Sequence, residues 1–431
     1  IFVITQHHNK GQNMHLLYNI LLHLFFIPIL CYLRRGILQR LGFLPERVQN
    51  IFKGKKIVWI HAASVGEVMG ISRMVTELKL NLPEYSILIS TITTTGTDIA
   101  RKLSAMGVIY LPIDLPLVVN RVLKMVNPKI LVITETELWP NLILQAKKRG
   151  IKVIIVNGRI SEKSIGRYQR IKGLFKKPLG TGVDLFCMQT ELDAERIASL
   201  GAPSEKIMVT GSAKFDLGVD IPSPEEIKRF LKEIEIADVL PIIITAGSIR
   251  EKEEEVILDA YQLIRQQAPD AVLIIAPRHL QRIEFIKKTL QKRNLPYSLR
   301  TRRNQRGIER KEEKAVIILD TIGELLLAYA VSSVAVVGGT FVPVGGHNII
   351  EPVALGKMVL FGPHVNNYHE ASKMLIAADA AIQVSSASGL ADKIIHLLEN
   401  PDEMSQKGLA GKKFVEENQG ASIRNVEAII K

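Results

Sequence analysis

The stretch "KIVWIHAASVGEV", residues 56–68, decides the fold of the first part of the chain. Its five leading residues form an almost continuous apolar run, which is typical of a buried strand. A helix follows, because apolar residues recur at helical spacing between Val68 and Leu78. Ser64 and Glu67 fit a capping box at the start of that helix, in which the glutamate accepts a free backbone N–H. The stretch therefore predicts a strand, a turn with a carboxylate, and a helix.

Gly66 fits this helix start poorly, because glycine in a first helical turn costs conformational entropy and adds no packing. A glycine is better explained if another molecule must approach the backbone beside Glu67. The spacing alone favours the capping role for Glu67, so both interpretations stay open at this point.

The same alternation of short apolar strands and amphipathic helices continues along the chain. It is interrupted at residues 217–226, "LGVDIPSPEE", which is typical of an interdomain linker. Continuous apolar strands indicate parallel sheets covered on both faces. We therefore predict two doubly wound, Rossmann-like α/β domains that face a cleft. The expected strands are "KIVWI", "SILIST", "VIYLP", "KILVIT", "KVIIVN", "DLFCM" and "KIMVTG" before the linker, and "PIIITAG", "AVLIIAP", "AVIILD", "SVAVVGG", "KMVLFG" and "AAIQV" after it.

Composition restricts the class of partner. The 431 residues include 56 Lys+Arg and 43 Asp+Glu, a formal net charge of +13, which favours a negatively charged partner. Aromatic residues make up only 6% and no nucleic-acid-binding motif is present, so nucleic acid is not the expected partner. The two cysteines, Cys31 and Cys187, form neither a disulfide framework nor a thiolate metal site, which fits a reducing compartment.

Residues 16–33 form an apolar segment near the start of the sequence. Its length is just sufficient to span a bilayer, although a helix lying flat on the membrane and a buried core helix are alternatives. The segment is followed by Arg34, Arg35 and Arg40, which by the positive-inside rule places the rest of the chain on the cytoplasmic side. Met14 is a plausible start residue. The sequence thus predicts a single N-terminal membrane anchor.

Ligands bind doubly wound sheets beyond the carboxyl ends of the strands, so polar residues there are candidates for a site. In the first domain these are Glu135 and Glu137 after "KILVIT", Arg159 after "KVIIVN" and Lys214 after "KIMVTG". The alternative for the glutamates is a favourable position at a helix start, and for the cations a surface ion pair. Two cations at one cleft suit an anionic substrate better.

The second domain offers an anion-binding turn at Gly247 and Ser248 and a loop rich in glycine over residues 338–346. Asn348 and Glu351 again fit a capping box, but a carboxylate fixed there is also suited to accept both hydroxyls of a ribose. Further candidates follow the other strands: Pro277, Arg278, His279, Ile322, Gly323 and Glu324.

Three common nucleotide-binding signatures are missing. The sequence contains no G-x-x-x-x-G-K-[ST] loop, no G-x-G-x-x-G after the first strand, and no Asp-x-Asp pair for a divalent metal on a diphosphate. An enzyme of nucleotide-activated sugars with this sequence must therefore neutralise its leaving phosphate with Arg, Lys and backbone dipoles.

Nine blocks of the sequence, in order, resemble the bacterial Kdo transferase family, whose members move 3-deoxy-D-manno-octulosonic acid (Kdo) from CMP-Kdo to a lipid A precursor (lipid IVA) in lipopolysaccharide synthesis. The resemblance extends from about Arg35 to the C-terminus. It implies a GT-B fold, an anchor at the cytoplasmic face of the inner membrane, and an inverting mechanism without metal or other cofactor. The blocks are "HAASVGEV", "YLPIDLP", "TETELWPN", "NGRIS", "KFD", "APRH", "DTIGELL", "VGGTFVPVGGHNIIEP" and "GPH".

The resemblance also implies roles for particular residues. Glu67 matches the catalytic base, which would explain Gly66 as space for the acceptor sugar. Glu137 and Lys214 match residues that stabilise the transition state, while Arg159 and Ser248 are possible substrate contacts. The positions implied to contact CMP are Pro277, Arg278, Ile322, Gly323, Glu324, Asn348, Ile349, Ile350 and Glu351.

The sequence departs from the family at two places. Ile249, Arg250 and Lys252 replace the usual Thr-His and Gly, and Ser212-Ala213 replaces Asn-Leu. The expected parts are a terminal extension and anchor (1–35), an acceptor domain (36–220) and a CMP-Kdo domain (221–431), whose last helices could return to the acceptor domain. The alternatives are another GT-B enzyme, such as a UDP-sugar transferase or an epimerase, and a GT-B module that binds without catalysis.

Overall fold

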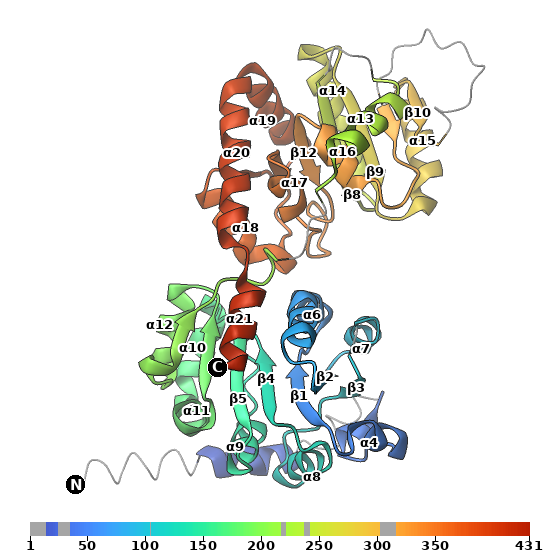
Figure 1. The fold of residues 1–431 in the computed structure, drawn as a ribbon. Helices are drawn as coiled ribbons and strands as arrows, with labels where there is room; N and C mark the ends of the chain where they lie inside the picture. Colours follow the sequence, from blue (N-terminus) through green and yellow to red (C-terminus); the bar gives the residue numbers. More distant parts are fainter. Residues whose placement is uncertain (1–13, 25–34, 104, 217–220, 237–241, 302–315) are drawn as a thin grey trace. The chain divides into compact units, whose positions relative to one another are not determined.

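The computed structural model describes residues 14–24, 35–103, 105–216, 221–236, 242–301 and 316–431. The chain forms two compact units (Figure 1). The first comprises Ile1–Gly218 together with Asn418–Lys431, and the second comprises Val219–Glu417. Each unit contains its own sheet and its own hydrophobic core.

Among the described residues of the first unit, seven parallel strands form a sheet in the order β3-β2-β1-β4-β5-β6-β7. Every predicted strand of the first set overlaps one of them. The strands are β1 (Lys56–His61), β2 (Tyr85–Thr91), β3 (Gly107–Tyr110), β4 (Ile130–Thr134), β5 (Lys152–Gly158), β6 (Leu185–Met188) and β7 (Ile207–Val209).

Helices cover both faces of this sheet. Ile57 and Trp59 belong to one core cluster and Val58 and Ile60 to another, because successive strand residues point to opposite faces. This explains why the strands are apolar throughout. The helices are α3 (Ile37–Arg40), α4 (Glu46–Phe52), α5 (Val65–Gly70), α6 (Ser72–Asn81), α7 (Thr94–Ala100), α8 (Pro116–Val126), α9 (Pro140–Lys148), α10 (Glu162–Arg170), α11 (Lys172–Lys177) and α12 (Glu191–Leu200). A π-helical turn (Pro178–Gly182) and a 3₁₀ turn (Ser204–Lys206) complete the connections.

The C-terminal helix α21 (Ala421–Ile430) belongs to the first unit. Asp216 fixes its start, since the carboxylate accepts the backbone N–H groups of Gly420, at 2.6 Å, and of Ser422. The Arg424 Nε donates to the carbonyl of Thr210 at 2.8 Å. The end of the chain is thus hydrogen-bonded to the segment that follows β7.

The second unit repeats the architecture, with strand order β10-β11-β9-β8-β12-β13-β14, all parallel. The short strand β10 was absent from the prediction, since "YSL" carries no apolar pattern. The strands are β8 (Ile243–Ile249), β9 (Val272–Pro277), β10 (Tyr297–Leu299), β11 (Val316–Ile318), β12 (Val334–Val337), β13 (Met358–Phe361) and β14 (Ala381–Gln383). The helices are α13 (Pro224–Glu233), α14 (Glu253–Gln267), α15 (Ile283–Lys292), α16 (Leu325–Val331), α17 (Ile350–Ala354), α18 (His369–Ala377), α19 (Ala387–Glu399) and α20 (Pro401–Asn418), with 3₁₀ turns at Leu280–Arg282 and Asn366–Tyr368.

The stretch predicted as a linker, 217–226, is partly helical. A capping box between Ser223 and Glu226 begins α13 within it. The prolines that suggested an irregular segment include Pro224, which occupies the first helical turn, where proline is well tolerated.

Residues 14–24 form a helix that packs against the first unit by one face. Tyr18 donates to the Asp114 carboxylate at 2.9 Å, and Asn19 accepts from the Asn141 side chain at 2.8 Å. The described part of the chain contains no helix of the length and apolarity needed to cross a membrane. The predicted anchor over 16–33 is therefore not supported as a span, and its part from residue 25 onward lies outside the described residues.

Candidate functional site

In the first unit, β1 and β4 are neighbours although β2 and β3 separate them in the sequence. Such a reversal of strand order opens a crevice at the carboxyl ends of the two strands, which is the usual ligand position in doubly wound sheets. Glu67 follows β1, and Glu135 and Glu137 follow β4. The topology therefore brings Glu67 to the same edge of the sheet as Glu135 and Glu137, which lie about seventy residues later in the sequence.

The Glu67 carboxylate is held by three hydrogen bonds. Its Oε2 accepts the backbone N–H of Ala63 and the hydroxyl of Thr134, both at 2.9 Å, and its Oε1 accepts the Ser64 hydroxyl at 3.0 Å. The predicted capping box is only half formed, because the carboxylate takes the N–H of Ala63 instead of that of Ser64. The capping interpretation is confirmed for Ser64, which caps the helix, while the Glu67 carboxylate is oriented at the strand ends.

Gly66 is exposed, and a Cβ atom built on it would meet only the Ser64 Oγ, 4.0 Å away. Its backbone is also in an ordinary conformation, so no contact or strain within the chain requires glycine there. The open space beside Glu67 supports the idea that another molecule approaches at this position.

Neighbouring carboxylates raise the pKa of Glu67 and of Glu137. Burial raises the pKa of Glu67, as does the Glu135 carboxylate, whereas the hydrogen bonds described above lower it. Burial, followed by the charges of Glu67 and Glu135, raises the pKa of Glu137 to about 7. Carboxylates with a pKa near neutrality are suited to accept or donate protons at physiological pH. Glu135 has a left-handed φ of 51°, a strained conformation typical of functional sites.

Arg159 and Lys214 lie in loops that other residues fix at the same edge of the sheet. The backbone carbonyl of Arg159 accepts the hydroxyl of Thr136. The loop that carries Lys214 is attached to the end of β5 through Asn157, whose Oδ1 accepts the N–H of Ala213 at 3.0 Å. Sequence reasoning missed Asn157 and Thr134, because neither a strand-end asparagine nor a threonine carries a distinctive signal.

The second unit contains a pocket of about 340 Å³ at the carboxyl ends of β8 and β9. Six predicted residues are among those that line it: Ser248, Pro277, Arg278, His279, Ile322 and Gly323. The structure thus brings together residues from three separate loops.

The remaining predicted residues of this unit have structural partners. Glu324 forms an ion pair with the buried Arg300 at 2.9 Å. Asn348 donates to the Glu351 carboxylate at 3.1 Å, while Ile349 and Ile350 are buried in the core. Burial raises the pKa of Glu351, and the charge of Arg278 and the bond from Asn348 lower it.

The glycine-rich loop after β12 is organised by Glu253, which sequence reasoning missed. This carboxylate is completely buried and accepts the backbone N–H groups of Arg250 at 2.8 Å, Gly339 at 2.6 Å and Phe341 at 2.8 Å. Gly339 has a φ of 68°, and a Cβ on Gly338 would lie 2.6 Å from the carbonyl oxygen of Ser248. Only glycines allow the loop to pack this closely against the end of β8.

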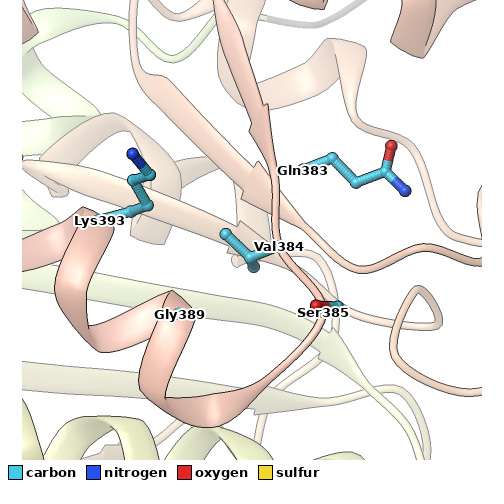
Figure 2. A pocket seen from close by; sticks show the side chains of 5 residues that line it. All are labelled: Gln383, Val384, Ser385, Gly389 and Lys393. Carbon is cyan, nitrogen blue, oxygen red and sulfur yellow. The ribbon is translucent and has the colours of Figure 1, made fainter.

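A larger hollow of about 480 Å³ lies between β14 and the start of α19 (Figure 2). It is lined by Gln383, Val384, Ser385, Gly389 and Lys393. In Figure 2, Val384 lies between the Gln383 and Lys393 side chains, so the two polar groups do not converge. None of the predicted residues lines this hollow, and the smaller pocket is the better candidate for a ligand site.

The fold agrees with that of solved enzymes of nucleotide-activated sugars. A UDP-GlcNAc 2-epimerase from Neisseria meningitidis superposes with a TM-score of 0.57, at 15% identity, over 87% of this chain and 100% of that one. A glycosyltransferase from Rickettsia africae gives a TM-score of 0.54, at 15% identity, over 88% and 99%. These likenesses place the chain in the class of proteins with two Rossmann-like domains of GT-B type.

Sequence comparison identifies the family. Residues 35–217 match the model of a family described as "3-Deoxy-D-manno-octulosonic-acid transferase (kdotransferase)". The chain is 34% identical, over 92% of its length, to the 3-deoxy-D-manno-octulosonic acid transferase of Haemophilus influenzae, of which it covers 91%. It is 35% identical to a bifunctional glycosyltransferase/methyltransferase of Fusobacterium nucleatum but covers only 58% of that protein. The chain belongs to the Kdo transferase family and is an enzyme of the glycosyltransferase type, which confirms the resemblance drawn from its sequence.

Proposed function

We propose that this enzyme transfers Kdo from CMP-Kdo to a hydroxyl group of a lipid A precursor, lipid IVA, with inversion at the anomeric carbon. The observation that carries the proposal is the position of Glu67. In a member of the Kdo transferase family, its carboxylate is fixed at a strand-order reversal by three hydrogen bonds, beside open space at Gly66.

Glu67 acts as the general base in this mechanism. It takes the proton of the acceptor hydroxyl, whose oxygen then forms a bond to the anomeric carbon of Kdo. The bond from that carbon to the CMP phosphate breaks, and its electron pair leaves with CMP. General base catalysis of this kind contributes roughly 10²–10⁴-fold to the rate. The bonds from Ala63, Ser64 and Thr134 keep the carboxylate in one orientation.

Glu137 and Lys214 stabilise the transition state. The anomeric carbon becomes positively charged as CMP departs, and a neighbouring carboxylate lowers the energy of that charge. Lys214 supplies a cation for the anionic groups of the two substrates. Arg159 is a further substrate contact on the same edge of the sheet. Like Glu67, each of these three side chains follows a strand of the first unit, as a shared site requires.

The pocket of the second unit binds the donor. Arg278 offsets the phosphate charge, and Ser248, Pro277, Ile322 and Gly323 line the space for the nucleotide. Glu351 accepts the ribose hydroxyls, with Asn348 holding its carboxylate and Glu324 completing the contacts from the neighbouring loop. Charge neutralisation by arginine and backbone dipoles makes a divalent metal unnecessary for the transfer step.

The helix over residues 14–24 binds the membrane that carries the acceptor. Five of its leucine and isoleucine side chains are exposed, among them Leu16 at 60% and Leu24 at 69%. Exposed apolar residues on a helix suit the boundary between lipid headgroups and acyl chains, and the net charge of +13 favours an anionic surface. The enzyme therefore works at the cytoplasmic face of the inner membrane.

A transfer assay tests the proposed function. Purified enzyme is incubated with lipid IVA and with CMP-Kdo generated in situ, and the product is examined by mass spectrometry. We expect a product heavier by one or more Kdo units. Calorimetric titration with CMP and UDP in parallel separates the specificity for cytidine from that for uridine. Absence of transfer by a folded protein that prefers UDP would overturn the proposal.

A further inference from the structure

Basic side chains gather where β8 and β9 end and where the glycine-rich loop after β12 closes. The Arg250 Nε donates to the Nε2 of His347 at 3.1 Å, and its Nη1 lies 3.4 Å from the Nε2 of His279. Arg278 immediately precedes His279 and lines the donor pocket with it. The cationic cluster is thus made of Arg250, Arg278, His279 and His347.

The Arg250 guanidinium has two imidazole rings as its side-chain neighbours. When its Nε donates to His347, the accepting Nε2 of that ring carries no proton. Burial, together with the charges of Arg278, Arg250 and His279, lowers the pKa of His347 to about 4, which is consistent with a neutral ring.

The acidic residues around Arg250 are engaged elsewhere. Glu253 accepts the backbone N–H of Arg250, and Glu251 and Glu254 pair with Arg282 at 3.6 and 2.8 Å. Within the described part of the chain, no carboxylate forms an ion pair with the Arg250 guanidinium. A guanidinium whose side-chain contacts are imidazole rings rather than carboxylates can receive an external anion.

The position of Arg250 is also fixed from the backbone side. The buried Glu253 accepts the N–H of Arg250 and those of Gly339 and Phe341 in the glycine-rich loop. His347, at the end of that loop, receives the Arg250 Nε. One network therefore joins the loop, the carboxylate and the guanidinium, and leaves the outer N–H groups of the guanidinium fork for a ligand.

The proposed donor carries two anionic groups, the phosphate of CMP and the carboxylate of the octulosonic acid. Resting on the proposed function, we propose that Arg250, held by His279 and His347, binds the carboxylate of the donor sugar, while Arg278 offsets the phosphate. The planar fork of arginine matches a carboxylate in bidentate geometry, which a lysine does not reproduce. Arg250 then distinguishes an acidic sugar from a neutral one.

The test compares two quantities in Arg250→Ala and Arg250→Lys: the KM for CMP-Kdo in the transfer assay, and the Kd for CMP by calorimetry. CMP lacks the carboxylate, so its Kd should change by less than about twofold, whereas the KM for CMP-Kdo should rise roughly 10- to 100-fold in the alanine variant. Arg250→Lys should fall between, since it keeps the charge but loses the fork. The unchanged affinity for CMP reports that the variant is folded.

Arg293→Ala is the matched control, because Arg293 pairs with Asp259 on the same unit but lies outside the cluster. His347→Ala gives a second measurement: it removes an acceptor of Arg250 and should raise the KM for CMP-Kdo less than Arg250→Ala does. An equal loss of affinity for CMP and CMP-Kdo in Arg250→Ala would assign Arg250 to the phosphate and overturn the inference. No change in either quantity would also overturn it. Failure of the wild-type enzyme to transfer Kdo would instead reject the proposed function.

Discussion

The hydroxyl of Thr134, the last residue of β4, lies 2.9 Å from the Oε2 of Glu67, in the helix after β1, and 2.9 Å from the carbonyl oxygen of His61, the last residue of β1. A hydroxyl carries one proton, so it donates to one of these oxygens at a time. Donation to Glu67 links β4 to the helix at the point where the order of the sheet reverses. It favours the ionised carboxylate, and so opposes the burial and the Glu135 charge that raise the pKa of Glu67. Thr134 thereby lowers the pKa of the proposed base and favours its ionised form.

Thr134→Val should shift the pH profile of transfer. Without the hydroxyl, the pKa of Glu67 rises further, so the acidic limb of kcat/KM against pH should move to higher pH. Thr245→Val is the control, since it removes a buried hydroxyl with an equally long bond, 2.9 Å, in the other unit. An unchanged acidic limb in Thr134→Val would show that Thr134 does not tune the base.

Glu137→Gln should increase stability while it lowers activity. The pKa of Glu137 is about 7 in the folded enzyme and 4.5 as a reference, so the folded state binds the proton more tightly. The wild-type enzyme therefore loses folding stability through this group as the pH rises from about 4.5 to 7, whereas the Glu137→Gln variant does not. Above pH 7 the variant should be more stable by on the order of 2 kcal/mol, and near pH 4 the two should be equal.

Urea unfolding followed by tryptophan fluorescence measures this effect, because both tryptophans, Trp59 and Trp139, belong to the first unit. Glu84→Gln, an exposed position on the same unit, is the control. A variant of Glu137 that loses stability at pH 8 would contradict the prediction.

Glu253→Gln should weaken the binding of CMP. Glutamine replaces one carboxylate oxygen by an amide that cannot accept, so one of the N–H groups of Gly339 and Phe341 is left without its acceptor. A buried unpaired N–H costs about 1–3 kcal/mol, and the loosened loop should raise the Kd for CMP roughly tenfold. Glu255→Gln changes an exposed glutamate of the same run and should leave the Kd unaltered. Equal Kd values for CMP in the two variants would show that Glu253 does not organise the donor site.

Replacing Leu16, Leu17 and Leu24 by serine should weaken binding to vesicles without loss of stability. These side chains are 60%, 53% and 69% exposed, so they contribute little to the core. Burying each in a membrane contributes up to about 1.5–3 kcal/mol, and flotation with anionic vesicles should detect the loss. The control replaces Leu80, Leu117 and Leu409, which are exposed elsewhere on the chain. Equal flotation of the two triple variants would contradict a specific membrane contact.

The sequence predicted the strands well because a doubly wound sheet buries both faces, and continuous apolar runs such as "KIVWI" have few other uses. The candidates Glu135, Glu137, Arg159 and Lys214 were predicted by one rule, that ligands lie beyond the carboxyl ends of parallel strands. The role of Glu253 was not predicted, because it lies in "REKEEE", where nothing in the sequence distinguishes a buried glutamate from its exposed neighbour Glu255. The return of the last helices to the first domain was expected, but not the particular contacts of Asp216 with α21, which join residues about two hundred positions apart. Tertiary contacts, rather than local pattern, determine both.

The central claim is that Glu67 is the base. It is tested most directly by measuring the transfer rate and the Kd for CMP of the Glu67→Gln variant. The Glu84→Gln variant serves as the control. Glutamine keeps the size of the side chain but cannot accept the proton of the acceptor hydroxyl. We expect transfer to fall by roughly 10²–10⁴-fold while the Kd for CMP stays within about twofold of wild type. Turnover like that of the wild-type enzyme in Glu67→Gln would contradict the account.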